Sequence, residues 1–361
     1  MAKGCFSKVV VRGVCTVVPG NRVCIDDEQS YYADPAKLQK LKKTVGLNTR
    51  AVAGEGVTPS DMMVSAARRL LADMRIDMQT VDCLICVLDN PDYKCPPTAC
   101  VIHGKLGMST DTMAFDVTHG CAGYVYGLYI AHSVIESGAA KRILLLVGDT
   151  KSHTIDVRDR ISAPLFGDGA AATLLDRDEN ATKSYFVLGA NGALYENIMI
   201  PAGGARLPSS EETRRPKPDE YGNVRSLENF TMNGRAVFDF TMGAVPENIK
   251  TALAYGGMSA SELDFLVLHQ ANKSILQNIA VRTGVLDMKK VPTETLAKFG
   301  NLAVASIPSV LNDQLSDVLT TRQCRLLLSG FGVGLAFGTA IIETNVIYAP
   351  KPFVYEETNN E

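Results

Sequence analysis

The chain has 361 residues, of which 46% are hydrophobic and 21% are charged, and its formal net charge is −3. This composition is ordinary for a globular protein with a large core, and its mild acidity gives no indication of nucleic-acid binding. No segment approaches the roughly 18–20 unbroken apolar residues of a membrane span, so we expect no membrane insertion. The basic residues of segment 1–18 are interleaved with apolar ones, which predicts a first strand rather than a signal sequence and therefore a cytoplasmic protein.

The chain contains two pairs of segments in which the two members have similar sequence patterns. Residues 66–90 and 247–272 each predict an amphipathic helix, a short polar link and an apolar strand. The segments that begin at Cys121 and Leu302 each predict a helix with small residues at its start, then a basic residue and a strand containing Leu-Leu-Leu. This self-similarity indicates duplication of an α/β unit. Apolar runs without polar alternation predict largely parallel strands that are buried on both faces.

The duplication divides the chain into an N-terminal half, residues 1–180, and a C-terminal half, residues 181–361. Segment 203–228 differs from its surroundings, because it is rich in proline and charge and lacks periodicity. We interpret it as a long surface loop. A lid over a substrate entrance is the alternative, since long loops in compact domains are often functional.

Nine cysteines are scattered over the chain, an odd number that does not indicate a disulfide framework. Cys83 and Cys86 form a C-x-x-C pattern, but they lie in an apolar run typical of a buried strand. No second Cys or His pair stands at ligand spacing, so we predict no metal site.

One cysteine is placed differently from the others. Cys121 follows the predicted strand MAFDV and precedes a helix, whose positive end favours a thiolate. His269 follows the strand LDFLVL, and we place Asn301, after LAKFG, at another strand-to-helix junction. His119 is interpreted as a neighbour of the cysteine without a role, and Asp149 as a turn residue at a strand end.

A Cys–His–Asn set at equivalent strand ends can serve acyl transfer, with the thiolate as nucleophile and the other two groups as hydrogen-bond donors to a carbonyl. The glycine-rich segment 329–338 can direct a backbone N–H into the same site. Position alone leaves a structural interpretation open, because buried free cysteines and single histidines are mostly core residues.

The motifs around these residues resemble those of thiolase-superfamily condensing enzymes, most closely the ketoacyl-acyl-carrier-protein synthase III type. FDVTHGCAGYVYGL resembles the nucleophile segment of that family, VLHQANKSI its His segment and FGNLAVASIPSVL its Asn segment. LFGDGAAATLL and SGFGVGLAFGTA resemble its two glycine motifs, and the resemblance runs nearly from end to end.

The resemblance implies a five-layered αβαβα fold built from two duplicated halves, and a homodimer. It implies that Cys121 carries the acyl group, and that His269 and Asn301 bind the carbonyl of a malonyl thioester. The backbone N–H groups of Cys121 and Val333 would form the oxyanion hole, and Phe331 is similar to the aromatic residue beside the nucleophile. The expected activity is decarboxylative condensation in fatty acid biosynthesis, without a cofactor and with acyl carrier protein as partner.

Other positions depart from the family. Its usual Trp and Arg, which hold the adenine of coenzyme A, are matched by Lys40 and Thr44. Ser274 stands where the family has a phosphate-binding Arg, and Arg235 replaces a family Asn. Lysine does not stack on adenine as an indole does, although it can contact phosphate.

Four substrate-binding residues are nevertheless expected: Phe331, Arg160 and Asn272 from the resemblance, and Lys273, which stands next to Ser274. Since the coenzyme A site is only partly present, we expect the acyl donor to arrive on the phosphopantetheine arm of a carrier protein.

Two alternatives stay open: an acyltransferase of the same fold that does not decarboxylate, and a non-catalytic partner subunit. Hydroxymethylglutaryl synthase relatives are set aside, because they use a Glu upstream of the cysteine and LDNPDYKCPPTAC contains none.

Overall fold

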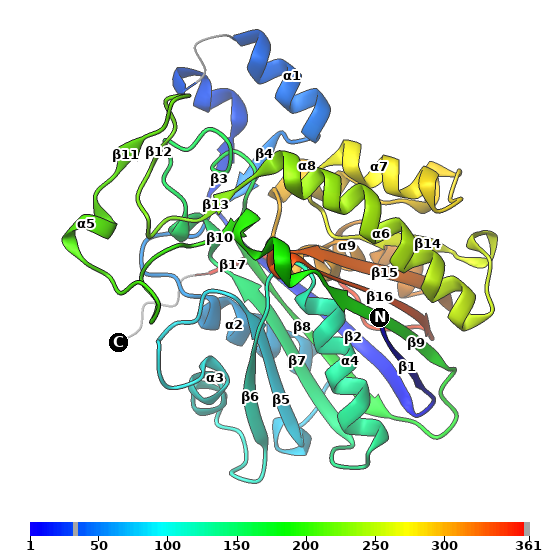
Figure 1. The fold of residues 1–361 in the computed structure, drawn as a ribbon. Helices are drawn as coiled ribbons and strands as arrows, with labels where there is room; N and C mark the ends of the chain where they lie inside the picture. Colours follow the sequence, from blue (N-terminus) through cyan, green and yellow to red (C-terminus); the bar gives the residue numbers. More distant parts are fainter. Residues whose placement is uncertain (32–34, 357–361) are drawn as a thin grey trace.

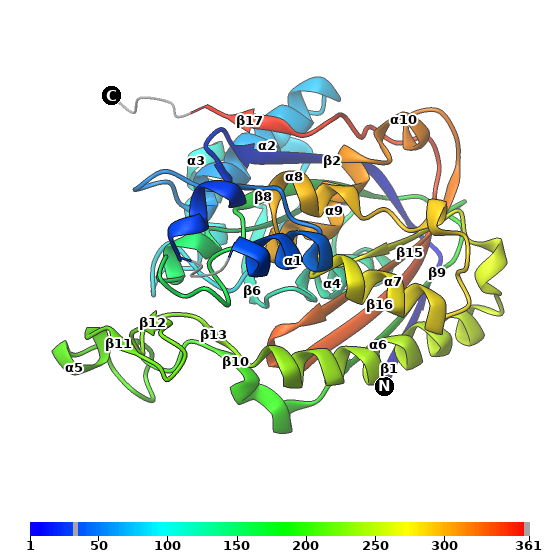
Figure 2. The same cartoon turned by 90° about the horizontal axis from the view of Figure 1, so that it is seen from above.

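The computed structural model describes residues 1–31 and 35–356. Two β-sheets lie face to face, with helices between them and on both outer faces (Figures 1 and 2). Each sheet is apolar on both faces, so it needs a covering layer on either side. The resulting order of helix, sheet, helix, sheet, helix confirms the five-layered thiolase-like fold.

The first sheet has six strands in the order β17-β2-β8-β7-β5-β6. α2 and α3 cover its outer face, where their apolar side chains pack on the strands. α2 begins at a capping box in which Thr58 and Asp61 satisfy each other's backbone N–H groups. The elements are β17 (Phe353–Tyr355), β2 (Val9–Pro19), β8 (Gly169–Arg177), β7 (Arg142–Asp149), β5 (Cys83–Leu88), β6 (Met113–Thr118), α2 (Pro59–Asp73) and α3 (Thr98–Leu106).

The second sheet has five strands in the order β1-β9-β16-β15-β14, and α6 and α7 cover its outer face. Its elements are β1 (Ala2–Phe6), β9 (Ser184–Ala190), β16 (Ala336–Thr344), β15 (Cys324–Gly332), β14 (Phe265–Leu268), α6 (Gly234–Gly256) and α7 (Lys273–Arg282). The first strand of the chain therefore joins the second sheet, and the last strand joins the first. The boundary between residues 180 and 181 stays a prediction.

Two helices, α4 (Gly123–Glu136) and α9 (Ser306–Asp313), fill the layer between the sheets. α4 is apolar around most of its circumference, as a helix between two sheets must be. Its residues Val125, Leu128 and Ile135 are fully buried in a core shared by both sheets. The helix that follows Cys121 is thus fixed by packing on both sides. This packing keeps the N-terminal end of α4, next to Cys121, in one place.

The prediction of largely parallel strands is wrong. β5 pairs parallel with β6 and β7, and β14 pairs parallel with β15, but β8 pairs antiparallel with both β2 and β7. β16 also pairs antiparallel with β9 and β15. Apolar runs without alternation report burial on both faces, and the helical layers provide that burial whatever the strand direction.

The remaining elements are short or peripheral. Segment 203–228 is not a structureless loop, because it contains a small helix and a two-stranded hairpin that project from the body (Figure 1). Among the described residues, no helix combines the length and apolar character that crossing a bilayer requires. These elements are α1 (Pro35–Val45), β3 (Arg22–Cys24), β4 (Thr49–Ala51), β10 (Ile198–Met199), α5 (Glu211–Arg214), β11 (Lys217–Pro218), β12 (Val224–Arg225), β13 (Thr231–Met232), α8 (Glu294–Phe299) and α10 (Ser316–Leu319).

Candidate active site

Cys121 lies in the connection between the end of β6 and the start of α4, as the sequence predicts. All nine cysteines are free thiols, and Cys121 is one of the buried ones, with 8% of its surface exposed. Burial raises the pKa of its thiol to about 12, although the nearby Lys151 acts in the opposite direction. The expected preference for the thiolate at the helix start is therefore outweighed by desolvation of the buried thiol.

The raised pKa of Cys121 predicts a steep pH dependence of its alkylation. Because the thiolate is the reactive form, its rate of modification by iodoacetamide should rise about tenfold per pH unit from pH 7 to 9, without a plateau. Peptide mass spectrometry at successive times would measure this rate for each cysteine. The exposed Cys5 and Cys95 serve as internal references and should be modified first at every pH. A plateau for Cys121 below pH 8 would contradict the prediction.

The turn after β15 approaches the nucleophile closely. The backbone N–H of Val333 forms a hydrogen bond with the Cys121 thiol. Gly332, at φ 156°, packs directly against the cysteine: a Cβ there would lie 2.7 Å from Cys121 Cβ and 3.0 Å from Sγ. The absence of a side chain at Gly332 thus lets a backbone donor reach the sulfur, as the glycine-rich sequence predicted.

His269 follows β14, and its backbone N–H continues the ladder with β15 by donating to Ser329 O at 2.9 Å. The His269 imidazole and the Phe331 ring make a T-shaped contact, with centroids 5.4 Å apart and planes at 84°. This contact restrains the orientation of the imidazole. Burial lowers the pKa of His269 to about 3. The imidazole is therefore neutral at physiological pH and has one N–H to donate.

Asn301 follows the helix α8, so its prediction at a strand-to-helix junction is wrong. The segment LAKFG is too amphipathic for a central strand, and a single bridge between Asn301 and Phe166 replaces a strand there. Asn301 Oδ1 accepts hydrogen bonds from Ala303 N at 3.0 Å and from Ser306 Oγ at 3.3 Å. With Oδ1 fixed in this way, the Nδ2 donors are left for the cavity.

A narrow cavity brings the three predicted residues together, and its free volume is about 50 Å³. Sequence reasoning correctly grouped Cys121, His269 and Asn301, together with Val333 and Phe331. Most of the remaining lining is apolar, with Lys151 as its charged exception. The other lining residues are Phe166, Ile198, Phe230, Met232, Val237, Thr241, Ala271, Ile275 and Gly332. Phe230 and Met232 follow directly after segment 203–228, so that excursion adjoins the cavity without lining it.

The other predicted binding residues lie outside this cavity. Asn272 caps α7, with its side-chain oxygen accepting from Ser274 N at 2.9 Å. Lys273 pairs with Glu294 at 3.3 Å, and Arg160 donates to the Gly222 carbonyl at 3.2 Å. Their contacts with substrate stay predictions.

A buried ion pair beside the nucleophile was missed. Lys151 is 2% exposed, and its ammonium donates to both oxygens of Asp89 at 2.8 and 2.7 Å. Asp149, read from the sequence as a turn residue, is also buried, and it accepts from the backbone N–H of Asp89 at 3.3 Å. A signal was present, because Asp89 and Asp149 mark the carboxyl ends of the adjacent strands β5 and β7. The segment LDNPDYKCPPTAC, which contains no Glu, thus supplies this buried pair with the carboxylate of Asp89.

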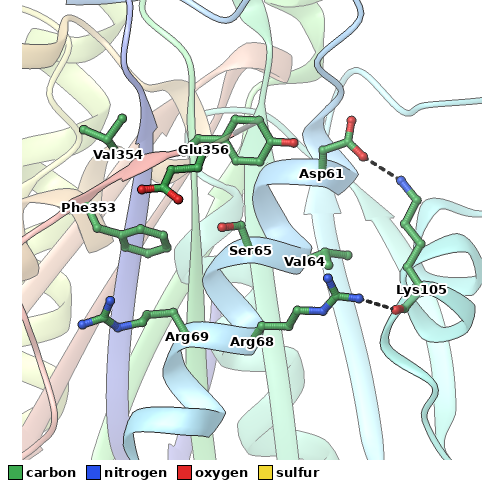
Figure 3. Close-up of a pocket in the computed structure, with 10 residues that line it drawn as sticks. Asp61, Val64, Ser65, Arg68, Arg69, Lys105, Phe353, Val354 and Glu356 are labelled. Atoms are coloured by element: carbon green, nitrogen blue, oxygen red, sulfur yellow. Dashed lines mark hydrogen bonds and ion pairs between the residues drawn. The ribbon is translucent and has the colours of Figure 1, made fainter. Parts of the chain in front are cut away.

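A larger hollow of about 570 Å³ lies between α2 and β17 (Figure 3). Its cations are engaged with neighbours: Arg68 donates to the Lys105 carbonyl at 2.8 Å, and Lys105 pairs with Asp61 at 2.7 Å. None of its lining residues lines the cavity at Cys121. In the part of the chain that the structure describes, no group of three His, Cys, Asp or Glu side chains could hold a metal ion.

Comparisons with known proteins agree with this geometry. Residues 115–192 match the family described as 3-oxoacyl-[acyl-carrier-protein (ACP)] synthase III, and residues 253–344 match its C-terminal part. The β-ketoacyl-[acyl-carrier-protein] synthase III of Lactococcus lactis is 33% identical over 340 residues, covering 93% of this chain and 99% of the relative.

Solved structures show the same likeness. A 3-oxoacyl-(acyl-carrier protein) synthase from Burkholderia xenovorans LB400 has a TM-score of 0.91 at 30% identity, covering 98% of this chain and 99% of that one. A 3-oxoacyl-(acyl carrier protein) synthase III from Pseudomonas aeruginosa PAO1 has a TM-score of 0.78 at 29% identity, covering 94% and 99%. Fold and relatives together define a thiolase-like condensing enzyme, a transferase. The chain belongs to the 3-oxoacyl-[acyl-carrier-protein] synthase III family.

Proposed function

We propose that the protein carries an acyl group on Cys121 and condenses it with a malonyl thioester, releasing carbon dioxide. The observation that carries this proposal is the single cavity lined by Cys121, His269 and Asn301. It combines a nucleophile with two separate sets of hydrogen-bond donors, which a two-step acyl transfer requires.

In the first step, the Cys121 sulfur attacks the carbonyl carbon of the donor thioester. A C–S bond to Cys121 forms, the C–S bond of the donor breaks, and the thiol proton leaves with the donor thiol. The negative charge on the carbonyl oxygen is met by the backbone N–H groups of Cys121 and Val333. Support for this assignment is the hydrogen bond that the Val333 N–H already makes with the sulfur.

In the second step, His269 and Asn301 Nδ2 donate to the thioester carbonyl of the malonyl group. The bond to its carboxylate breaks, carbon dioxide leaves and the electron pair forms an enolate. The enolate carbon then attacks the acyl carbon, and the bond to the Cys121 sulfur breaks. A neutral His269 suits this role, since the reaction needs a hydrogen-bond donor and no cofactor.

The acyl donor in this proposal is a carrier protein rather than coenzyme A. Lys40 and Thr44 are exposed on α1, whose end packs on α7: a Cβ at Gly46 would lie 2.8 Å from Lys273 Cβ. Lysines at this surface can meet a phosphate, but no Trp is present anywhere in the chain to stack on adenine. Equal acylation rates from acyl-coenzyme A and acyl-carrier protein would overturn this choice. We also propose a homodimer, as the family resemblance implies, and a cytoplasmic location.

The test follows Cys121 and carbon dioxide together. The enzyme is mixed with an acyl thioester and then with malonyl-carrier protein, while intact mass and carbon dioxide release are recorded. We expect the mass of one acyl group on Cys121, followed by release of carbon dioxide and formation of the condensed product, and neither the acyl mass nor the product in Cys121→Ala. Cys5→Ala, which removes an exposed thiol on β1, should behave as wild type. Acylation without carbon dioxide would instead show an acyltransferase, and absence of acylation would favour a non-catalytic subunit.

A further inference from the structure

The charged pair Lys151–Asp89 has no part in the chemistry proposed above, yet Lys151 lines the same cavity and holds Asp89 beside it. Lys151 lines the cavity with Cys121, and its Nζ lies 4.9 Å from the centre of the Phe230 ring, another lining residue. Asp89 lies close to the segment that carries Cys121: a Cβ at Gly120 would lie 3.1 Å from Asp89 Oδ2 and 3.0 Å from Val333 Cγ2. The pair therefore adjoins the residue before the nucleophile and the turn that carries the proposed oxyanion donor.

A saturated acyl chain would gain no favourable interaction from a charged pair beside Cys121. Removing a lysine and a carboxylate from water costs several kcal/mol per ion, and their attraction often does no more than offset that cost. Apolar residues of similar size would line a pocket for an alkyl chain at no such cost. Apart from Cys121, His269 and Asn301, the lining is mostly apolar with one ammonium group, and such a cavity matches a ligand that is mostly apolar with one polar group.

The charges of Lys151, Asp89 and the neighbouring Asp149 determine which polar group of a ligand this part of the cavity can bind. Lys151 and Asp89 neutralise each other at 2.8 and 2.7 Å, so the pair has no net charge to offer an acidic ligand. Burial and the charge of Asp89 raise the pKa of Asp149 well above its usual value, which works against a further negative charge at this place. A carboxylate on the substrate would add an unbalanced negative charge next to Asp89.

A hydroxyl group matches both members of the pair. The ammonium has three N–H donors, of which two can serve the Asp89 oxygens and one is left for a ligand. The Asp89 carboxylate has more acceptor positions than Lys151 occupies. A hydroxyl can accept from Lys151 and donate to Asp89 at the same time.

The size of the cavity limits the length of the chain that carries this hydroxyl. Its free volume of about 50 Å³ is small for a ligand cavity. This space favours an acyl group of a few carbon atoms over a long fatty chain.

We propose that Lys151 and Asp89 make the enzyme selective for short hydroxyacyl thioesters, whose hydroxyl group they bind beside Cys121. This inference rests on the proposed acylation of Cys121, because it concerns the group that the cysteine receives. It assigns the pair a role in specificity, not in bond making.

The experiment compares pantetheine thioesters of butyrate, both enantiomers of 3-hydroxybutyrate, and succinate as acyl donors. Single-turnover acylation of Cys121 is followed by intact mass. We expect one hydroxybutyryl enantiomer to react at least about tenfold faster than butyryl, the size of one discriminating hydrogen bond of about 1.4 kcal/mol. Succinyl should react most slowly.

A double variant tests the pair itself. Lys151→Met with Asp89→Asn removes both charges together, which avoids leaving one charge buried alone. We expect it to lose the preference for hydroxybutyryl, so that the ratio of the hydroxybutyryl and butyryl rates falls to about one whatever the absolute rates. The control Lys351→Met with Asp317→Asn removes a surface Lys–Asp pair 3.3 Å apart and should keep the preference. Thermal unfolding confirms that both variants fold.

The outcomes separate this inference from the proposed function. Acylation by butyryl and hydroxybutyryl at equal rates, a preference for succinyl, or an unchanged preference in the folded double variant would each overturn the selectivity and leave the acylation of Cys121 standing. If the double variant does not fold, the wild-type ratio of the hydroxybutyryl and butyryl rates decides alone. If no donor acylates wild-type Cys121, both the inference and the proposed function are wrong.

Discussion

Replacing Gly332 with alanine is expected to lower the rate of Cys121 acylation by at least about 100-fold, because displacement of a reacting group by about 1 Å has effects of that size. The new methyl group would lie 2.7 Å from Cys121 Cβ, a distance that Cβ contacts do not tolerate. Either the cysteine or the turn carrying Val333 must move, and both belong to the proposed oxyanion hole. The measurement is single-turnover acylation followed by intact mass, with thermal unfolding recorded in parallel.

Gly243→Ala is the matched control. Gly243 lies exposed in α6 with no atom within 4 Å of an added Cβ. Alanine there should leave acylation unchanged and stabilise the protein by up to ~1 kcal/mol, the difference in helix propensity. A Gly332→Ala enzyme that folds and acylates like wild type would refute the close approach between this turn and the nucleophile.

The sequence predicted the parts of the site that follow from local order along the chain. Cys121 and His269 each come directly after an apolar strand, and the carboxyl ends of such strands collect ligands in α/β sheets. The glycine-rich turn was identifiable because a backbone donor needs small residues around it. Apolar strands alternating with helices predicted a duplicated α/β fold, whereas the five layers were implied by the family resemblance.

The strand directions and the buried pair could not be derived in the same way. Burial on both faces gives the same apolar pattern for β8 as for β7, although the two run antiparallel. Lys151 and Asp89 are 62 positions apart, and only the neighbouring places of β5 and β7 in the sheet bring them together. A charged residue directly after a strand predicts an exposed turn, and only the covering layers of the fold show that it is buried.

Asn301→Asp is expected to separate the two proposed steps. The substitution keeps Oδ1, which accepts from Ala303 N and Ser306 Oγ, and replaces only Nδ2, the proposed donor to the malonyl carbonyl. An oxygen there faces the developing enolate with a lone pair or a negative charge instead of an N–H. We expect carbon dioxide release to fall by about 100- to 1,000-fold, the effect of losing one oxyanion donor.

Acylation of Cys121 should stay close to the wild-type rate in Asn301→Asp, because the donors for that step are the backbone N–H groups of Cys121 and Val333. Asn180→Asp, in an exposed turn after β8, makes the same chemical change away from the site and should alter neither step. Equal losses in both steps would mean that Asn301 only maintains the shape of the cavity. Unchanged decarboxylation would remove Asn301 from the proposed donors, and His269 would then have to stabilise the enolate alone.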